Sequence, residues 1–510
     1  MLRLPTDWKV FFTLLWGTVL GCHDGQFPSG QIDIPPTIAS PELTAPIADI
    51  NAASRVRLGI ETRISGDGSS DPHNYALTYD WTCSEGSTSS ASAFEITFWE
   101  IGTVECTLTV SSESGLSSTA SVSIEVHEDD AMWTVMVFVN GDNDLEAAGL
   151  GDINEMETVG STPDVNIVVQ FDRSPEYSAN DGNWDGARRF YIEPDEDETT
   201  IGSPVVTELG EVDSGDADTV VDFVQWAVGS YPAERYALVF WNHGWGWSIT
   251  PDRGPPDDME RAIPGWNKGL SSDASTGNYL SVAFGDFEAV LQGATDAIGN
   301  PLDLVGIDAC VMASWEIAHA AAPFAEVMVA SQADEAWDGW PYHTWLADLV
   351  EDPSMEADAL GSVITQRFNE IPDATLSAVD LNSLYLLDEA IDQLATTLLE
   401  DDDGTTTYLN AASSALSFEN YTTERDLGDL LSGIAARSPT EGNAHQHASE
   451  TLGVLEGLVI ANFLHGNEVQ GATGLTIHAP TSADLSATYR SASWSADTLW
   501  DDFLDAALTP

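Results

Sequence analysis

Positively charged residues are scarce in this sequence. Its 510 residues include 16 Lys and Arg against 84 Asp and Glu, which gives a formal net charge of -68. A surface of this sign repels phosphate, so the composition argues against nucleic acid as a partner. Two interpretations of the charge stay open together: a solvated acidic surface suited to a saline habitat, and attraction of positively charged substrates.

Long hydrophobic runs are also lacking. The apolar run at residues 10–20 is too short to span a bilayer and, with Arg3 and Lys9 before it, is typical of a signal peptide. The four residues that end at Cys22 resemble the bacterial lipobox, whose cysteine becomes the lipidated N-terminus of the mature protein. We therefore expect residues 1–22 to be a lipoprotein-type signal peptide. The exported protein would be attached to a membrane through acyl chains on Cys22.

Cysteine is rare, and the four cysteines have different surroundings. Cys22 is assigned to lipid. Cys83 and Cys106 lie in one small β-rich region, where they can pair in an oxidising compartment. Cys310 stands alone, and a reactive thiol is one reason for an exported protein to keep an unpaired cysteine.

The first part of the chain predicts a linker and a small β-domain. Residues 23–47 are rich in proline and poor in large apolar residues, which is typical of a linker. Residues 48–128 alternate apolar and polar side chains between Gly- and Ser-rich turns. This pattern predicts an all-β sandwich, which we interpret as a spacer or a weak binding module.

The rest of the chain predicts an α/β fold. From Trp133 onward, near-continuous apolar strands alternate with amphipathic helices, as in buried parallel sheets. We predict an open, mostly parallel sheet flanked by helices over residues 130–345, with a hairpin that joins residues 189–193 to 205–209. Residues 346–510 are predicted to form a C-terminal α/β extension, mainly helical up to residue 465. Ligands of such sheets bind at the carboxyl ends of the strands.

Cys310 lies at one of these strand ends. Residues 302–307 form an apolar strand, a turn follows, and residues 311–322 have helical character. A thiol beside a helix N-terminus has a lowered pKa, and its thiolate is the nucleophilic form. The alternative is an inert cysteine buried in the core.

His243 lies at a second strand end. It follows the apolar strand at residues 236–241 and precedes Gly244 and Gly246, which let backbone N–H groups approach a ligand closely. Alone, such a histidine is more often structural. A histidine and a cysteine at the ends of neighbouring strands supply the base and the nucleophile that thiol catalysis needs.

Four motifs in this order and spacing resemble the clostripain family of cysteine peptidases, part of the caspase-like clan. The resemblance covers about residues 130–505, and residues 48–128 resemble PKD or other immunoglobulin-like modules. The resemblance to the clostripain family implies a caspase-like fold and hydrolysis of peptide bonds in protein or peptide substrates. The motifs are Gly141-Asp142-Asn143-Asp144-Leu145, Asn242-His243-Gly244, Asp308-Ala309-Cys310 and Gly474-Leu475-Thr476-Ile477.

The resemblance also assigns catalytic roles. It makes Cys310 the nucleophile and His243 the general base and acid, with the N–H groups of Gly244 and Cys310 stabilising the oxyanion. A third catalytic residue is not evident from the sequence. In the family, the acid two residues before the nucleophile lies at the base of the S1 pocket, and Asp308 holds that position here.

A carboxylate at this position implies cleavage after Arg and, less efficiently, after Lys. A second acid is expected to help, and the candidates are Asp334, Glu335 and Asp338. The alternative is that Asp308 only caps the following helix.

Two further expectations follow from the resemblance. Clostripain is helped by calcium, so the acid-rich loops of this chain are candidates for Ca²⁺, although EF-hand spacing is missing and we assign no metal ligands. Family members are often cut between the catalytic His and Cys, and residues 248–284 are rich in Gly, Pro and Asp. We predict self-cleavage after Arg261 or Lys268, with an uncut loop as the alternative.

Two other functions compete with an endopeptidase. One is an inactive caspase-like protein used for adhesion or binding together with the β-domain. The other is a different thiol hydrolase, such as an amidase or a transpeptidase. The presence of both Cys310 and His243 argues against the inactive protein.

Overall fold

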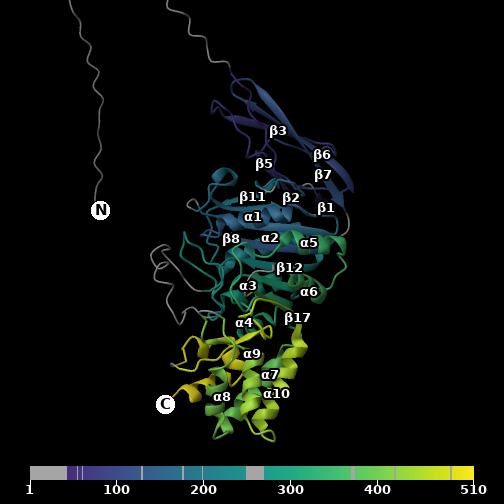
Figure 1. The fold of residues 1–510 in the computed structure, drawn as a ribbon. Helices are drawn as coiled ribbons and strands as arrows, with labels where there is room; N and C mark the ends of the chain where they lie inside the picture. The colour runs from purple at the N-terminus through teal and green to yellow at the C-terminus, as the bar shows by residue number, and fades with distance from the viewer. Residues whose placement is uncertain are drawn as a thin grey trace, which may run out of the picture. The chain divides into compact units, whose positions relative to one another are not determined.

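The computed structural model describes most of the chain (Figure 1). The predicted signal peptide with Cys22, and the predicted cleavage sites Arg261 and Lys268, lie outside the described residues. The described residues are 43–53, 55–59, 61–127, 130–174, 177–197, 199–247, 269–368, 374–418, 421–482 and 485–509.

The N-terminal part is built of β-strands only, as the sequence predicts. One sheet has the order β1-β7-β6-β3-β4, and β2 pairs with β5. Along β6 and β3, buried residues such as Trp81 and Leu108 alternate with outward-facing ones. The strands are β1 (Arg55–Arg57), β2 (Glu61–Ser65), β3 (Leu77–Cys83), β4 (Thr88–Ser89), β5 (Ala93–Thr97), β6 (Gly102–Ser112) and β7 (Ser117–His127).

The predicted disulfide is confirmed in this region. Cys83 and Cys106 are directly opposite each other on the antiparallel strands β3 and β6, and their sulfurs are bonded. Both side chains are buried. The bond therefore fixes the register of these two strands.

The following part contains a nine-stranded sheet of order β11-β10-β9-β8-β12-β13-β14-β15-β17. Its five central strands are β9, β8, β12, β13 and β14, and they are parallel, as predicted. The predicted hairpin is the antiparallel pair of β10 and β11. The strands are β8 (Ala131–Gly141), β9 (Val165–Arg173), β10 (Gly186–Tyr191), β11 (Val205–Gly210), β12 (Ala233–Trp241), β13 (Leu302–Asp308), β14 (Ala325–Ala330), β15 (Ala374–Asp380) and β17 (Val459–His465).

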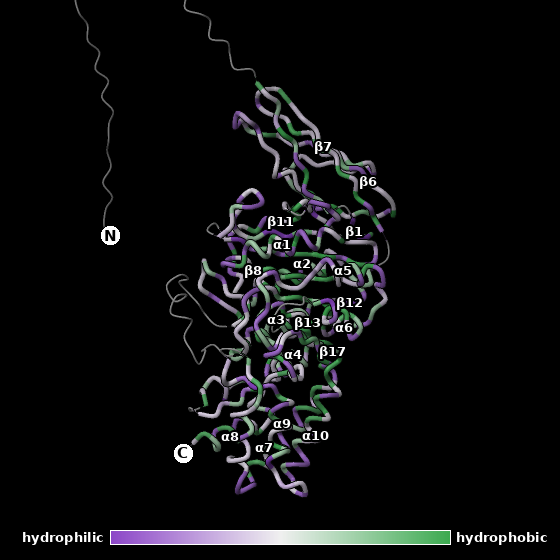
Figure 2. Tube along the Cα trace, viewed as in Figure 1, coloured by the Kyte–Doolittle hydropathy of each residue, from purple (hydrophilic) through white to green (hydrophobic). Residues whose placement is uncertain are grey.

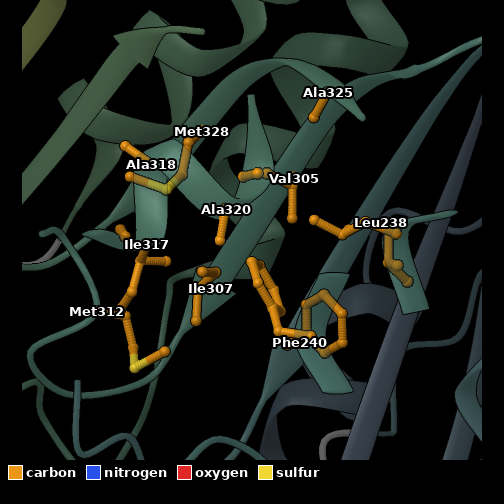
Figure 3. Close-up of a cluster of buried hydrophobic side chains, with 14 of the residues drawn as sticks. Leu238, Phe240, Val305, Ile307, Met312, Ile317, Ala318, Ala320, Ala325 and Met328 are labelled. Atoms are coloured by element: carbon orange, nitrogen blue, oxygen red, sulfur yellow. The ribbon is translucent and has the colours of Figure 1, made fainter. Parts of the chain in front are cut away.

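Helices cover both faces of this sheet, because alternate side chains of each buried strand point to opposite faces. On one face, strand residues such as Phe138, Phe240 and Ile307 pack with α2, α3 and α4. Figure 3 shows Phe240 and Ile307 in this cluster together with Ile317 and Ala320 of α4. On the other, residues such as Val137 pack with α1, α5 and α6. The helices are α1 (Glu146–Glu157), α2 (Ala217–Ser230), α3 (Asp286–Ile298), α4 (Trp315–Ala321), α5 (Tyr342–Glu351) and α6 (Ala357–Arg367).

The sheet takes two strands from the C-terminal region, β15 and β17. The second was not predicted, because Val459 continues directly from the end of a helix and the strand lies half-buried at the sheet edge. Figure 2 shows the alternation of hydrophobic and hydrophilic segments along this part of the chain. The other elements are α7 (Tyr385–Glu400), α8 (Gly404–Ala412), β16 (Glu424–Asp426), α9 (Leu427–Arg437), α10 (Asn443–Leu458), β18 (Thr476–His478), α11 (Ser493–Asp497) and α12 (Trp500–Leu508), with short 3-10 turns at Asp181–Asn183 and Tyr489–Ser491.

Within the part of the chain that the structure describes, none of the helices has the length and apolar character needed to cross a bilayer.

Loss of the disulfide should destabilise the β-domain alone. We expect the Cys83→Ala/Cys106→Ala variant to lose about 2–4 kcal/mol of domain stability, because the reduced unfolded chain gains conformational freedom. In calorimetry of the full chain, the transition of the β-domain should move down by roughly 10–30 °C. The transition of the α/β part should stay in place. An unchanged thermogram would contradict a structural role for the bond.

Candidate active site

The candidate site lies at the edge of the sheet where the parallel strands β8, β12 and β13 end. Trp241 of β12 pairs with Val139 of β8 and with Asp308 of β13. His243 and Cys310 each follow these paired positions by two residues. The parallel register therefore brings the predicted base and the predicted nucleophile to one edge.

His243 has a carboxylate partner that the sequence did not reveal. Its Nε2 lies 2.8 Å from Oδ1 of Asp144, in the loop that follows β8. Although burial alone would raise the pKa of Asp144, the hydrogen bond and the charge of His243 hold it below its usual range. A third residue was not evident from the sequence, and the structure places Asp144 where it can orient the imidazole. The motif at residues 141–145 contained this residue, but nothing in it identified the partner.

Asn242, next to His243, links its own loop to the loop that carries Asp144. Its Nδ2 donates to the carbonyl of Asn140 at 2.7 Å and to that of Ser272 at 3.2 Å. The side-chain Nδ2 of Asn143 donates to the same two carbonyls, at 3.0 and 3.3 Å. These buried bonds hold the backbone on both sides of the Asp144–His243 contact.

Gly244 allows the His243 loop to approach the Cys310 turn. A side-chain carbon added at Gly244 would lie 2.3 Å from the carbonyl oxygen of Cys310, well inside contact distance. Glycine is therefore required here for close approach of the two backbones. This contact supports the prediction that both loops contribute to one site.

The surroundings of Cys310 correct one expectation. The helix that follows begins at Trp315 and is capped by Ser314, so the thiol lies in a turn rather than at a helix N-terminus. Within this turn, which follows the end of β13 at Asp308, Val311 takes a left-handed conformation with φ 55°. Burial, together with nearby carboxylates, raises the pKa of the Cys310 thiol. The expected low-pKa thiolate is thus wrong for this arrangement.

The loop at residues 331–340 folds over Cys310. The N–H of Glu335 donates to Sγ of Cys310 at 3.2 Å, and the N–H of Val311 donates to the carbonyl of Ala333 at 3.0 Å. Trp337 on this loop is 59% exposed, and its ring lies edge-on to the imidazole of His243. One loop therefore contacts both predicted catalytic residues.

The C-terminal motif at residues 474–477 supports this loop and the Cys310 turn. The N–H of Gly474 donates to Oε1 of Gln332 at 2.9 Å, and the N–H of Thr476 donates to the carbonyl of Ala313 at 2.9 Å. This motif, although far from the others in the sequence, thereby holds both segments of the site in place.

Asp308 lies buried behind Cys310, with its carboxylate inside the protein. Its Oδ2 accepts hydrogen bonds from the N–H of Trp340 at 3.0 Å and the hydroxyl of Tyr342 at 2.9 Å. It does not cap the following helix, because Ser314 does. Burial raises the pKa of Asp308 to about 6.

Two more carboxyls lie beside Asp308, from half-buried Glu335 and buried Asp152. Glu335, a predicted pocket residue, is hydrogen-bonded to it, and burial together with Asp308 raises the pKa of Glu335 well above its usual range. Of the two carboxyls, Glu335 is thus the one whose surroundings favour the protonated form. Asp152 of α1, which the sequence did not single out, accepts from Nε1 of Trp241 at 2.6 Å. Of the other predicted acids, Asp334 is half-buried and Asp338 is exposed.

Carboxylates that are candidates for a metal lie farther along the same edge. Oxygens of Asp142, Glu211 and Asp273 come within 4.8 Å of one another. The sequence assigned no metal ligands, and these three residues are far apart along the chain.

Comparison with known proteins agrees with this arrangement. The sequence model of the clostripain family matches residues 137–506, and that of the PKD domain matches residues 43–126. The chain is 26% identical to clostripain from Hathewaya histolytica over 227 residues, which are 41% of this chain and 40% of that protein. The match thus spans less than half the length of clostripain.

Two solved structures share the fold. An inactive zymogen C11 protease from Parabacteroides distasonis has 19% identity and a TM-score of 0.53, over 73% of this chain and 99% of that one. A secreted C11 cysteine protease from Bacteroides thetaiotaomicron, solved with an irreversible peptide inhibitor, has 19% identity and a TM-score of 0.52, over 73% of this chain and 100% of that one.

The family match covers most of the chain and includes all four motifs that the structure assembles or braces at the sheet edge. The fold is the caspase-like α/β sheet, and the β-domain before it matches the PKD domain. The chain belongs to the clostripain family.

Proposed function

We propose that this protein is a cysteine endopeptidase that cleaves after Arg and, less efficiently, after Lys. The observation that carries the proposal is the convergence of Cys310 with the His243–Asp144 pair at the carboxyl edge of one sheet. Membership of the clostripain family supports the reaction class. An inactive binding protein is disfavoured, because a cysteine and a carboxylate-paired histidine follow level positions of two neighbouring strands, as thiol catalysis requires.

The raised pKa of Cys310 indicates how the reaction begins. The resting thiol is neutral, so His243 takes its proton as Sγ attacks the substrate carbonyl. Since Nε2 faces Asp144, Nδ1 is the nitrogen left for this transfer. The same proton then goes to the leaving amine as the C–N bond breaks. Water, deprotonated by His243, hydrolyses the thioester and returns the thiol.

Backbone donors would stabilise the charge that develops on the substrate oxygen. We assign this role to the N–H groups of Gly244 and Cys310, as the family resemblance implies. The close approach of Gly244 to the Cys310 backbone supports the assignment.

Substrate preference follows from the carboxylates behind Cys310. Asp308 and Asp152 converge on one point, because a side-chain carbon added at Gly339 would lie 3.0 and 2.9 Å from their oxygens. A guanidinium can meet such a group with parallel hydrogen bonds, and an ammonium with one point charge. When the cation of the substrate enters, Glu335 would either lose its proton or move away from Asp308.

Export supports the same function. A disulfide forms in oxidising compartments, and the sequence before the described residues resembles a lipoprotein signal ending at Cys22. We propose that the protein is exported and lipid-anchored. Its substrates would be proteins or peptides with basic residues, which the charge of -68 attracts.

The first prediction concerns the catalytic residues. Cys310→Ala and His243→Ala should abolish hydrolysis of an arginyl peptide, and Asp144→Asn should lower kcat by about 10- to 1,000-fold, because the imidazole loses its orienting charge. KM should change little. Asp164→Asn is the matched control, since this exposed residue lies at the opposite end of the sheet. Labelling of Cys310 by an arginyl acyloxymethyl ketone tests the nucleophile directly. Activity that survives in purified Cys310→Ala rules out the proposal.

The second prediction concerns pH. Asp308 has its pKa raised to about 6, so its carboxylate is charged above this value and neutral below it. The ratio of kcat/KM for an arginyl substrate over its uncharged citrulline analogue should therefore fall as pH drops through 6. Using the ratio cancels any effect of pH that is common to both substrates. In Asp308→Asn the ratio should be low and independent of pH. A pH-dependent ratio in that variant would place the specificity elsewhere.

The third prediction concerns maturation. Arg261 and Lys268 lie between β12 and β13 in the sequence, so a chain cut after either residue should stay together through the pairing of these neighbouring strands. Active protein should run as two bands on a denaturing gel and as one species in gel filtration. Cys310→Ala should remain a single band. An active enzyme that stays uncut would show that this processing is not needed.

A further inference from the structure

A buried group of side chains connects the segment after His243 with the segment after Cys310. From the first segment comes Trp247, four residues after His243, and from the second comes Glu316 of α4, six residues after Cys310. Both side chains are buried, Glu316 completely. A link between them would act on both catalytic residues of the proposed peptidase.

The two-stranded sheet of β16 and β18 provides this link. Glu424 and His478 lie opposite each other in the sheet, and Nδ1 of His478 is 2.8 Å from Oε1 of Glu424. The indole N–H of Trp247 donates to the same oxygen at 3.3 Å. Oε1 of Glu316 accepts from the backbone N–H of His478 at 2.9 Å. One small sheet thus contacts both catalytic segments.

Aromatic rings enclose the group. The indole of Trp247 lies edge-on to the rings of His478, Tyr489 and Trp494, with centroid distances of 4.8, 4.8 and 5.7 Å. The hydroxyl of Tyr489 donates to Oε1 of Glu316 at 2.9 Å. Electrostatic interactions are strong in such apolar surroundings. The position of Trp247 therefore depends on the charges of the glutamates in this group.

The hydrogen bonds within the group satisfy only one oxygen of each glutamate. Oε2 of Glu316 and Oε2 of Glu424 are both buried and have no hydrogen-bond partner among the described residues. Burial and the charge of Glu424 raise the pKa of Glu316 to about 7. Two carboxylates in one buried site repel each other when both are ionised, so the group favours a proton on Glu316.

Other titratable groups act on this pair from the neighbouring elements. Arg425, next to Glu424 on β16, donates to the carbonyl of Ala415 at 3.1 Å and is thus already engaged. Asp501 of α12 adds a further negative charge near Tyr489. His478 contacts both glutamates, as described above.

We propose that Glu316 is a positioning residue for the peptidase reaction, whose proton keeps Trp247 and the His243 loop in their working place. This inference rests on the function proposed above. When Glu316 releases its proton to solvent, its new charge repels Glu424. The long bond from Trp247 to Glu424 is then lost first. The loop at 242–247 keeps its anchor at Asn242, but its other end is no longer held.

The pH dependence of kcat tests this role. Glu316→Gln keeps an acceptor for His478 and Tyr489 and carries an amide N–H at every pH. The ratio of its kcat to that of the parent, on an arginyl peptide, should be constant below pH 6. It should then rise roughly threefold or more, with a midpoint near pH 7. Glu389→Gln, an exposed residue on α7, is the matched control and should give a flat ratio. A flat ratio for Glu316→Gln as well overturns the positioning role.

A second variant tests whether the effect passes through Trp247. Trp247→Phe keeps an aromatic ring but loses the N–H that donates to Glu424. We expect kcat to fall about 3- to 10-fold with little change in KM, because the loop is held less firmly while the substrate pocket is untouched. Adding Glu316→Gln to this variant should no longer give a ratio that rises with pH. A rise that persists in the double variant contradicts the proposed link.

Thermal melting tests the proton without any assay of activity, so failure of this inference can be told from failure of the proposed function. A carboxyl whose pKa is raised on folding, here from 4.5 to about 7, contributes stability that is present below 4.5 and lost as pH rises through 7. The melting temperature of Glu316→Gln minus that of the parent should therefore increase by roughly 3 °C or more between pH 5 and 8. A difference that stays constant overturns the proposal.

Discussion

The parallel pairing of β8, β12 and β13 is the constraint on which the site depends. Trp241 is held level with Val139 and Asp308, and so the loops after these strands start from one line. A slip of one residue would turn every buried side chain of a strand to the opposite face, which the packed helices on both sides prohibit. The hydrophobic core thus determines the position of His243 relative to Cys310.

Several carboxylates are crowded together at this edge of the sheet, and the negative charge of each group is balanced in a different way. Asp144 is paired with His243, while Glu335 shares a proton with Asp308. Among the residues that the structure describes, two buried oxygens of the group around Asp142 have no hydrogen-bond partner. In the proposed peptidase, the cation of the substrate completes the group around Asp308. An acidic protein thereby uses its excess charge for recognition as well as solubility.

The sequence predicted those features that are local or periodic. Buried strands, the β10–β11 hairpin, the Cys83–Cys106 bond and the strand-end positions of His243 and Cys310 follow from apolar runs and their spacing. Contacts between distant parts of the chain could not be predicted. The sequence therefore did not reveal that Asp144 contacts His243 or that Asp152 contacts Trp241. The pKa of Cys310 was predicted in the wrong direction, because burial by a loop that follows the strand β14 outweighs any helix effect.

The electrostatics of Cys310 connect recognition with chemistry. Besides burial, the negative charges of Asp334, Glu335 and Asp308 raise the pKa of the thiol. A cationic substrate side chain that neutralises Asp308 removes part of this repulsion just as the scissile carbonyl reaches the sulfur. In the proposed peptidase, a neutral side chain would leave the thiol harder to deprotonate. Preference for Arg would then appear in kcat as well as in KM, since binding energy is used to activate the nucleophile.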